Sequence, residues 1–246
     1  TRGMSSAASD VYKRQPLMGS IYFGAMIVAL TLNLNLVLPA FKLILVDAFN
    51  GTAIAGGTFF GVLIYGVRRG AFSNEAGMGT ESLVHGVAKV SNPVKQGLVA
   101  MTGPIFDTLI ICTATALMIL VSGVWETSSS QGVTLTSEAF SVLLGSLGGF
   151  ILFVCVICFG LSTIFTYSYY GASCSRFLFG KFGMKFYIYL YILSIFIYSI
   201  VPIDIAINIA DGAFAMMAIP TLISALWLAP KVMQASKNYF KLINNN

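Results

Sequence analysis

The chain has 246 residues, of which 57% are hydrophobic and 9% are charged, whereas an ordinary soluble domain carries roughly 25% charged residues. Its 14 Lys and Arg against 9 Asp and Glu give a formal charge of +5, but the basic residues lie singly or in pairs between apolar runs. A water-soluble globule is therefore excluded, and nucleic acid is not an expected partner, because it requires a basic patch. One His and four Cys indicate neither a metal site nor a disulfide framework. We predict an all-α polytopic membrane protein.

The first fifteen residues, 1–15, differ abruptly from the apolar sequence that begins at Pro16. They contain no apolar stretch of the kind found in a signal peptide. The run 6–15 is typical of translated adapter sequence, and the alternative is a short solvated cytoplasmic tail. We expect 1–15 to be a non-native leader, 16–246 to be the native domain, and the chain to be a fragment of a longer protein.

Six apolar runs are candidates for membrane crossings, because about 20 residues of helix span the hydrocarbon core of a bilayer. The second run is short and the fourth is long. The six predicted crossings are Leu17–Pro39, Thr52–Val67, Gly97–Gly123, Ala139–Gly171, Phe186–Pro202 and Ile205–Ala229.

Basic residues fall almost entirely on one side of these crossings, and cytoplasmic loops are the ones that retain Lys and Arg. If the segment before Leu17 is inside, the outer connections contain one basic residue, Lys42. We therefore expect both ends in the cytoplasm and the protein in the plasma membrane, in bacteria the inner membrane. The inner basic residues are Arg68, Arg69, Lys89, Lys95, Arg176, Lys181, Lys185, Lys231, Lys237 and Lys241.

Residues that weaken a helix gather directly after the short second crossing. Glycine disfavours helix, and Ser and Asn bond to the local backbone instead of propagating it. In a transporter such a break exposes backbone groups that can hold a substrate or a cation. The alternative is a glycine-rich turn in which Glu75 pairs with Arg68 or Arg69. The residues concerned are Gly70, Ser73, Asn74, Gly77 and Gly79.

Several stretches in collinear order resemble one family, the alanine or glycine:cation symporters, also called sodium:alanine symporters. The resemblance covers about 230 residues, which makes chance a poor explanation. The chain departs from the family pattern at Thr80-Glu81-Ser82, where Ser-Ala-Pro is usual, at Tyr167, where Trp is usual, and at Thr221, where Asn usually follows the Pro. The matching stretches are 69–79, 92–97, 106–117, 121–125, 159–165, 168–171, 217–220 and 222–223.

The family is similar to the leucine-transporter-like fold, in which two inverted repeats of five helices enclose a site at the membrane midplane. The resemblance implies that the six crossings are helices five to ten of that fold. The outer loop from Trp125 to Glu138 would separate helices seven and eight. Helix one, which supplies part of the substrate and sodium ligands in the fold, would then lie outside this chain.

The resemblance implies sodium-coupled symport of a small neutral amino acid, alanine or glycine, by alternating access. Sodium is then the co-transported cation, the lipid bilayer is a partner, and no cofactor is expected. An ion channel or a non-transporting membrane subunit is the alternative, because hydroxyl-lined helices also suit a pore. We do not expect an enzyme, because the single His is not placed with a catalytic cluster.

For the substrate, the resemblance assigns residues of the helix break together with two residues of the long fourth crossing. Tyr167 is four residues beyond Thr163, so a helix places both on one face; the alternative for Tyr167 is simple packing. The implied substrate residues are Phe72, Ser73, Asn74, Gly77, Thr163 and Tyr167.

For sodium, hydroxyl oxygens of the fourth crossing are suitable ligands, since a hard cation prefers oxygen. The family resemblance places a Ser/Thr pair at Ser162 and Thr163, with Thr166 one turn on. From the residues alone, each hydroxyl could instead bond to its own helix at i−4.

Two aspartates inside apolar runs are further candidates, because ionisable groups in hydrocarbon are costly. Asp107 follows Pro104 and could cap a broken turn, carry a proton or face water. Asp211 lies in the last predicted crossing, where we expect it to bond to a neighbouring helix.

Overall fold

The structure is a computed structural model that describes residues 18–49, 58–75, 77–86 and 88–244. Within these ranges the chain is helical and contains no strand. The chain divides into two units, the first made of Thr1–Leu63 and Ile110–Tyr191 and the second of Ile64–Leu109 and Ile192–Asn246. The predicted leader 1–15 lies outside the described residues.

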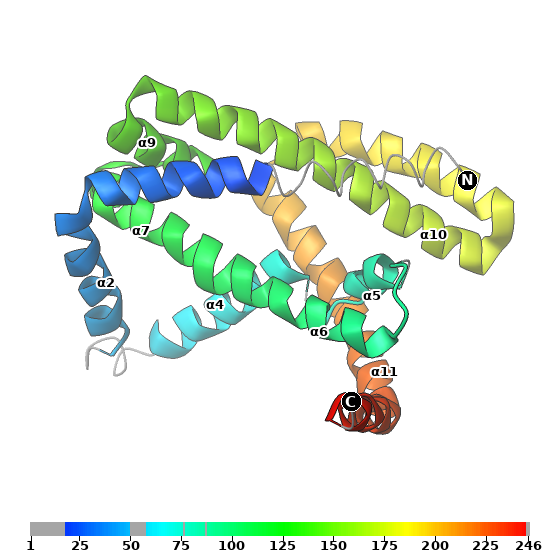
Figure 1. Cartoon of the computed structure of the whole chain (residues 1–246). Helices are drawn as coiled ribbons and strands as arrows, with labels where there is room; N and C mark the ends of the chain where they lie inside the picture. Colours follow the sequence, from blue (N-terminus) through cyan, green and yellow to red (C-terminus); the bar gives the residue numbers. More distant parts are fainter. Residues whose placement is uncertain (1–17, 50–57, 76, 87, 245–246) are drawn as a thin grey trace. The chain divides into compact units, whose positions relative to one another are not determined.

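The first unit opens with two helices, Met18–Leu32 and α2 (Leu34–Ala48), which meet at 101° (Figure 1). The bend lies at Asn33, whose backbone is not helical (φ −124°, ψ 34°) and whose side-chain amide donates to the carbonyl of Ala29 at 2.9 Å. Sequence analysis predicted one crossing that ends at Pro39. That boundary is wrong, because α2 continues to Ala48 and carries Lys42, which was expected in a connection.

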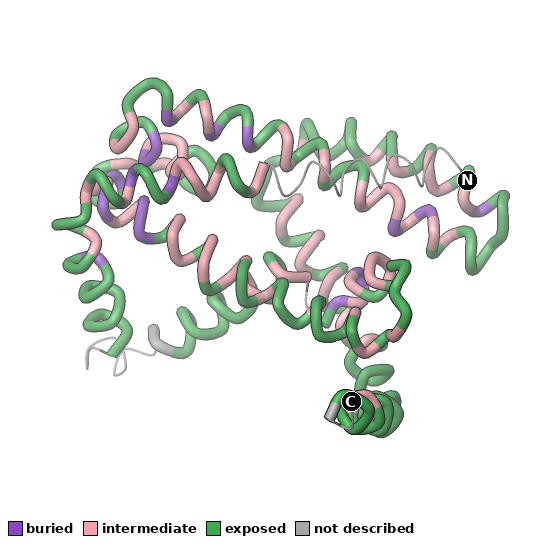
Figure 2. Tube along the Cα trace, viewed as in Figure 1, coloured by how far each residue is buried: buried purple, intermediate pink, exposed green. Residues whose placement is uncertain are grey.

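The core of the first unit forms where the Met18–Leu32 helix meets the helices around residues 113–152. Its largest fully buried side chains are Met26, Met118 and Phe140. Figure 2 colours the buried positions along the chain purple. The ring of Tyr22 stacks on Phe140 at 5.6 Å, and its hydroxyl lies 2.9 Å from the Thr115 hydroxyl. The surrounding helices are α7 (Thr113–Ser122), α8 (Val124–Thr127), α9 (Val133–Leu144) and α10 (Ser146–Ile200).

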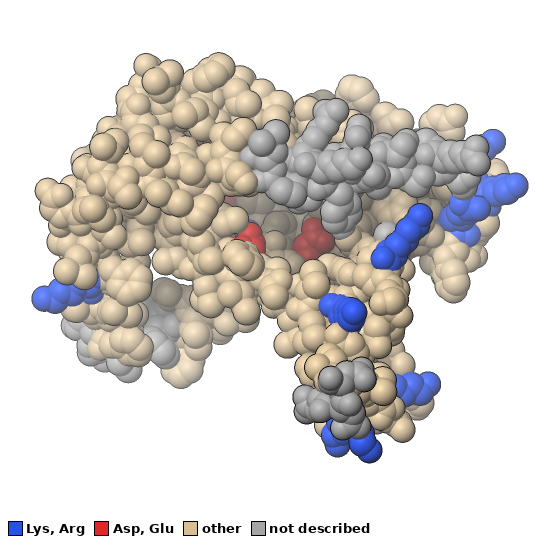
Figure 3. All heavy atoms as spheres, in the orientation of Figure 1, with Lys and Arg blue, Asp and Glu red and all other residues tan. Residues whose placement is uncertain are grey.

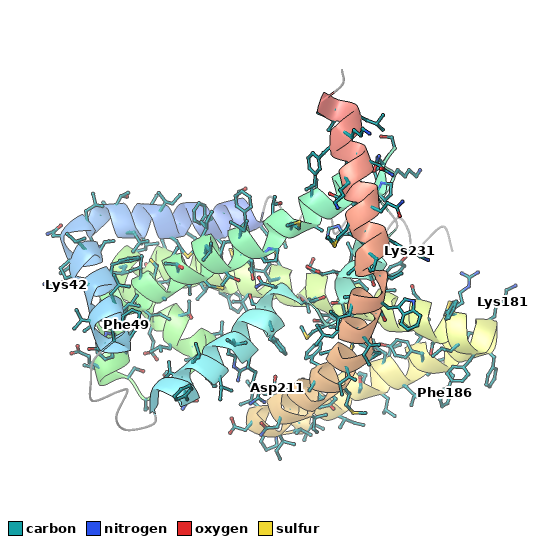
Figure 4. All side chains as sticks on the ribbon, turned by 90° about the horizontal axis from the view of Figure 1, so that it is seen from below. Lys42, Phe49, Lys181, Phe186, Asp211 and Lys231 are labelled. Carbon is teal, nitrogen blue, oxygen red and sulfur yellow. The ribbon has the colours of Figure 1, made fainter. Side chains whose placement is uncertain are left out.

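Helix α10 is two helices joined at Gly180, whose φ of 68° and ψ of −155° interrupt the helix. The second arm folds back on the first, since the Tyr191 hydroxyl donates to the carbonyl of Ile164 at 2.8 Å and the Tyr187 ring lies against Gly171. Figure 4 labels Lys181 beside this turn. The fourth and fifth predicted crossings correspond largely to these two arms.

In the second unit, α6 (Pro93–Pro104) continues directly into the π-helix η1 (Ile105–Cys112). The side chain of Asn92 caps α6 by accepting from the Val94 amide at 2.9 Å, and Pro93 takes the first helical position, where its missing N–H costs nothing. The change to wider π turns begins directly after Pro104, which has no N–H to donate to the preceding turn.

The other helices of the second unit are α4 (Thr58–Asn74), of which the first residues belong to the first unit, α5 (Thr80–His85) and α11 (Ile203–Asn244). Helix α4 ends seven residues after the predicted boundary at Val67 (74 − 67 = 7). Arg68 and Arg69, expected in an inner loop, therefore lie on a helix. Helix α11 contains Pro220 and Pro230 and changes direction along its length (Figure 1), as proline inside a helix causes.

Among the residues that the structure describes, three helices are long and apolar enough to cross a bilayer, and the bent pair Met18–Leu32 and Leu34–Ala48 is a fourth candidate. At most about a sixth of the most apolar window of each is buried within the chain, so the outward side chains suit lipid or another apolar surface. Charged side chains are few on the face in Figure 3. The chain is a multi-pass membrane protein; the count of six stays a prediction. The three helices are Pro93–Ser122, Ser146–Ile200 and Ile203–Ile243.

Candidate functional site

The helix break predicted from glycine, serine and asparagine is present between α4 and α5. Three residues of the connecting turn have positive φ: Glu75 (54°), Gly77 (79°) and Gly79 (92°). This left-handed backbone cannot continue an α-helix. The left-handed turn therefore interrupts the i+4 hydrogen-bond pattern of α4 directly after Ser73 and Asn74.

The side chains of Ser73 and Asn74 bond to two consecutive residues of η1. The Ser73 hydroxyl donates to the Asp107 carboxylate. The side-chain amide nitrogen of Asn74 donates to the Thr108 hydroxyl oxygen at 2.7 Å, and the Thr108 hydroxyl donates to the side-chain amide oxygen of Asn74 at 2.9 Å. Sequence analysis missed Thr108, although it follows Asp107 as a second polar residue in an apolar run.

An ion pair and an aromatic contact join α4 to α11. The guanidinium of Arg68 pairs with the carboxylate of Asp211, whose side chain is only 6% exposed. Figure 4 labels Asp211 on α11. Phe72 packs edge-to-face on Phe214 with ring centroids 4.9 Å apart. The prediction that Asp211 bonds to a neighbouring helix is confirmed. The alternative interpretation of the break paired Glu75 with Arg68 or Arg69, but the salt-bridge partner of Arg68 is Asp211.

Two departures from the family pattern meet at Gly79. A Cβ on Gly79 would lie 2.8 Å from the Thr221 hydroxyl oxygen, which itself donates to the Met217 carbonyl at 2.9 Å. The next residue, Thr80, is 3% exposed, and its hydroxyl has no hydrogen-bond partner within the described residues. Thr221 of α11 thus lies against the break at Gly79, the residue that precedes Thr80.

In the first unit, two of the three hydroxyls expected at a sodium site bond to their own helix. Thr163 donates to the Phe159 carbonyl at 2.9 Å, and Thr166 donates to the Ser162 carbonyl at 2.8 Å. These are the i−4 bonds of the alternative interpretation. Each bond uses the hydroxyl proton and leaves lone pairs on the oxygen that can accept a cation.

Tyr167 packs edge-to-face on Tyr170 at 5.7 Å, one turn beyond Thr163 on the same helix. The structure therefore brings Phe72, Ser73 and Asn74 together within the second unit, with Gly77 in the adjoining turn. The remaining predicted site residues, Ser162, Thr163, Thr166 and Tyr167, lie on α10 of the first unit.

Apolar helices that carry hydrogen-bonded polar residues at a helix break are typical of membrane transporters. A model of the sodium:alanine symporter family matches residues 2–246. The chain belongs to this family.

Individual relatives agree with that assignment. The sodium/alanine symporter AgcS of Methanococcus maripaludis is 34% identical over 233 residues, which cover 94% of this chain and 51% of the relative. In Bacillus subtilis, the "Probable sodium/glutamine symporter GlnT" is 33% identical over 91% of this chain and 47% of its own length. The amino-acid carrier protein AlsT of the same organism is 30% identical over 92% and 48%.

The chain spans about half the length of the curated relatives it matches. These relatives are named symporters and carriers of amino acids, with sodium in two of the three names. The family is one of transporters rather than enzymes, and it supports cation-coupled amino-acid transport in general.

Proposed function

We propose that this chain takes part in sodium-coupled symport of a small neutral amino acid, alanine or glycine, across the plasma membrane. The observation that carries the proposal is the broken helix at residues 75–79, whose three positive φ values leave backbone groups outside the helical hydrogen-bond pattern. The family assignment and the sodium/alanine name of a relative support the same function.

In this proposal the break binds the polar ends of the amino acid through its backbone. Ser73 and Asn74 contribute main-chain groups, because their side chains are bonded to Asp107 and Thr108. Gly77 allows a close approach of the substrate, since it has no side chain and a Cβ there would meet nothing within 4 Å. Phe72, held by Phe214, bounds the pocket.

Thr163 and Tyr167 bound the amino-acid side chain, and Ser162, Thr163 and Thr166 supply hydroxyl oxygens to sodium. A small pocket excludes larger side chains sterically. One methylene is worth only about 1–3 kcal/mol, so alanine and glycine are both accepted. Another relative is named a probable sodium/glutamine symporter, and glutamine has a larger side chain than alanine. In this proposal the size of the pocket therefore decides which amino acid is accepted.

We further propose that the crossings are helices five to ten of a leucine-transporter-like fold, with both ends of the chain in the cytoplasm. The break on α4–α5 supports this, because transporters of that fold bind substrate at interrupted helices. The excess of Lys and Arg in the connections assigned to the inside supports the orientation.

The test is uptake of labelled alanine into liposomes, with and without an inward sodium gradient. The chain is expressed together with the half of the Methanococcus maripaludis symporter that it does not match. We expect sodium-dependent uptake that is lost in Ser162→Ala and reduced in Thr163→Val. Ser199→Ala is the matched control, because Ser199 also donates within α10, to Phe196 at 2.7 Å. Uptake indifferent to sodium would overturn the coupling.

A further inference from the structure

The second unit contains an open groove at the connection from α5 to α6 (Figure 1). Its volume is about 370 Å³, within the range of roughly 300–1,000 Å³ for small-molecule sites. Pro93 lines the groove and begins both α6 and the candidate membrane span Pro93–Ser122. The groove therefore lies at the end of a crossing, the level at which lipid headgroups meet a membrane protein.

His85 at the end of α5 and Gln96 on α6 form the polar part of the groove. The side-chain amide nitrogen of Gln96 lies 2.7 Å from Nδ1 of His85. Because an amide nitrogen can only donate, Nδ1 accepts this bond and the ring proton is on Nε2. The Nε2–H of His85 and the second amide N–H of Gln96 are then donors for a ligand rich in acceptor oxygens.

The backbone amides at the start of α6 are already bonded within the chain. The Val94 amide donates to the side chain of Asn92 at 2.9 Å, and the Lys95 amide donates to the Asn92 carbonyl at 3.1 Å. Pro93 has no N–H. An anion in this groove therefore depends on side chains rather than on the end of the helix.

Two exposed lysines adjoin the groove in the sequence. Lys89 lies between two lining residues of the connection, and Lys95 directly precedes Gln96. Within the part of the chain that the structure describes, neither lysine forms a salt bridge. The nearest acid in the sequence, Glu81, lies one turn before His85 on α5. The groove thus combines polar donors with two positive charges.

The rest of the wall is apolar and includes Ala88, Val90, Pro93 and Ala100. Apolar surface beside donors and cations suits a phospholipid better than a free phosphate ion, because a lipid also offers methylene groups. We propose that the groove binds the headgroup of an anionic phospholipid. Its phosphate accepts from His85 and Gln96, and Lys89 and Lys95 supply the charge. The site goes beyond the proposed symport, since it does not depend on what is transported.

The test is equilibrium binding of fluorescent phosphatidylglycerol to the purified chain in detergent micelles. We expect unlabelled phosphatidylglycerol to displace the probe, and phosphatidylcholine and inorganic phosphate not to displace it. Lys89→Gln with Lys95→Gln should weaken binding by about 25-fold, because each lysine near a membrane surface contributes about fivefold. Lys237→Gln with Lys241→Gln is the matched control, since it removes the same charge from exposed positions of α11 in the same unit.

Gly97→Leu tests the groove separately from its charge. Gly97 lines the groove and a Cβ there meets nothing within 4 Å, so the leucine fills the groove without straining α6 and should abolish the specific binding. Gly103→Leu on the same helix also has open space and should bind as the wild type does.

Three results would overturn the proposal. Equal binding in the two glycine variants would show that the groove is not the site. Displacement of the probe by inorganic phosphate would assign the groove to free phosphate instead of lipid. Equal losses in the two double lysine variants would leave only a general attraction between the basic chain and anionic lipid.

Discussion

Arg68 of α4 and Asp211 of α11 form an ion pair whose carboxylate is almost fully enclosed, with 6% of its side chain exposed, while the Arg68 side chain is 49% exposed. Asp211 lies within a predicted apolar crossing, where a single unpaired charge is unfavourable. The pair holds α4, which carries the break, to the first half of α11.

Removing one member of this ion pair should lower the stability of the protein more than removing both. Asp211→Asn leaves the Arg68 charge without its partner, and we expect a loss of about 2 kcal/mol, less than for a fully enclosed pair because Arg68 is half exposed. The double variant Arg68→Met, Asp211→Leu should recover most of the lost stability, because it leaves no unpaired charge. Thermal unfolding in detergent measures both; equal losses in the single and double variants would contradict the account.

Gly79→Ala should destabilise the break. The substitution places a Cβ at φ 92°, 2.8 Å from the Thr221 hydroxyl oxygen, and the strained backbone alone costs about 1–3 kcal/mol. Adding Thr221→Ala should recover only the stability lost to the contact with the Thr221 hydroxyl, because the backbone strain at residue 79 remains. Gly70→Ala on α4 is the control, since a Cβ there meets nothing within 4 Å. A neutral Gly79→Ala in thermal unfolding would show that the turn is not held in this conformation.

Gly171→Ala should loosen the α10 hairpin, because its Cβ would enter the space of the Tyr187 ring. Tyr187 also stacks on Tyr191 at 5.9 Å, so both rings must move, at an expected cost of about 1–2 kcal/mol. Gly160→Ala in the same arm has open space and should be neutral or slightly stabilising. Equal melting temperatures for the two variants would argue against the packed hairpin.

Glu138 should make the loop before α9 sensitive to acid. Hydrogen bonds from the hydroxyls of Ser128 and Ser130 hold the pKa of the Glu138 carboxyl below its ordinary value of 4.5; the Ser130 bond is 2.6 Å long. The folded loop therefore favours the carboxylate. Its contribution to stability is complete above the unfolded pKa and is lost as pH falls through the folded one.

Carbon NMR of the Glu138 side chain follows this titration directly. Ser128→Ala and Ser130→Ala should each raise the pKa of Glu138 toward 4.5, whereas Thr136→Val, which alters a hydroxyl bonded to the Gly132 carbonyl at 3.2 Å, should not. An unchanged titration in both serine variants would show that the two bonds do not form.

The sequence predicted the helix class, the family and the helix break because each leaves a local signal. Apolar runs, a collinear motif and glycines at 70, 77 and 79 are all readable from neighbouring residues. The prediction that Asp211 bonds to a neighbouring helix was also confirmed, because a buried charge requires a partner wherever in the sequence that partner lies.

Contacts between distant segments were not predictable in the same way. Nothing in the sequence indicates that Arg68, which looks like a loop residue, reaches Asp211, 143 positions away. The bond between Asn74 and Thr108 depends on the π-helical register of η1, which has no strong signal besides Pro104. The boundary errors at Pro39 and Val67 arose because helices continued through residues that usually end them.

Symport requires that sodium and a small amino acid cross the membrane together. The most direct measurement is the reverse flux: proteoliposomes holding the chain with its complementing half are given an inward alanine gradient, and labelled sodium is followed with no sodium gradient. We expect alanine to drive sodium inward and Ser162→Ala to abolish this flux. Sodium entry that is the same with and without alanine would contradict symport and indicate a channel.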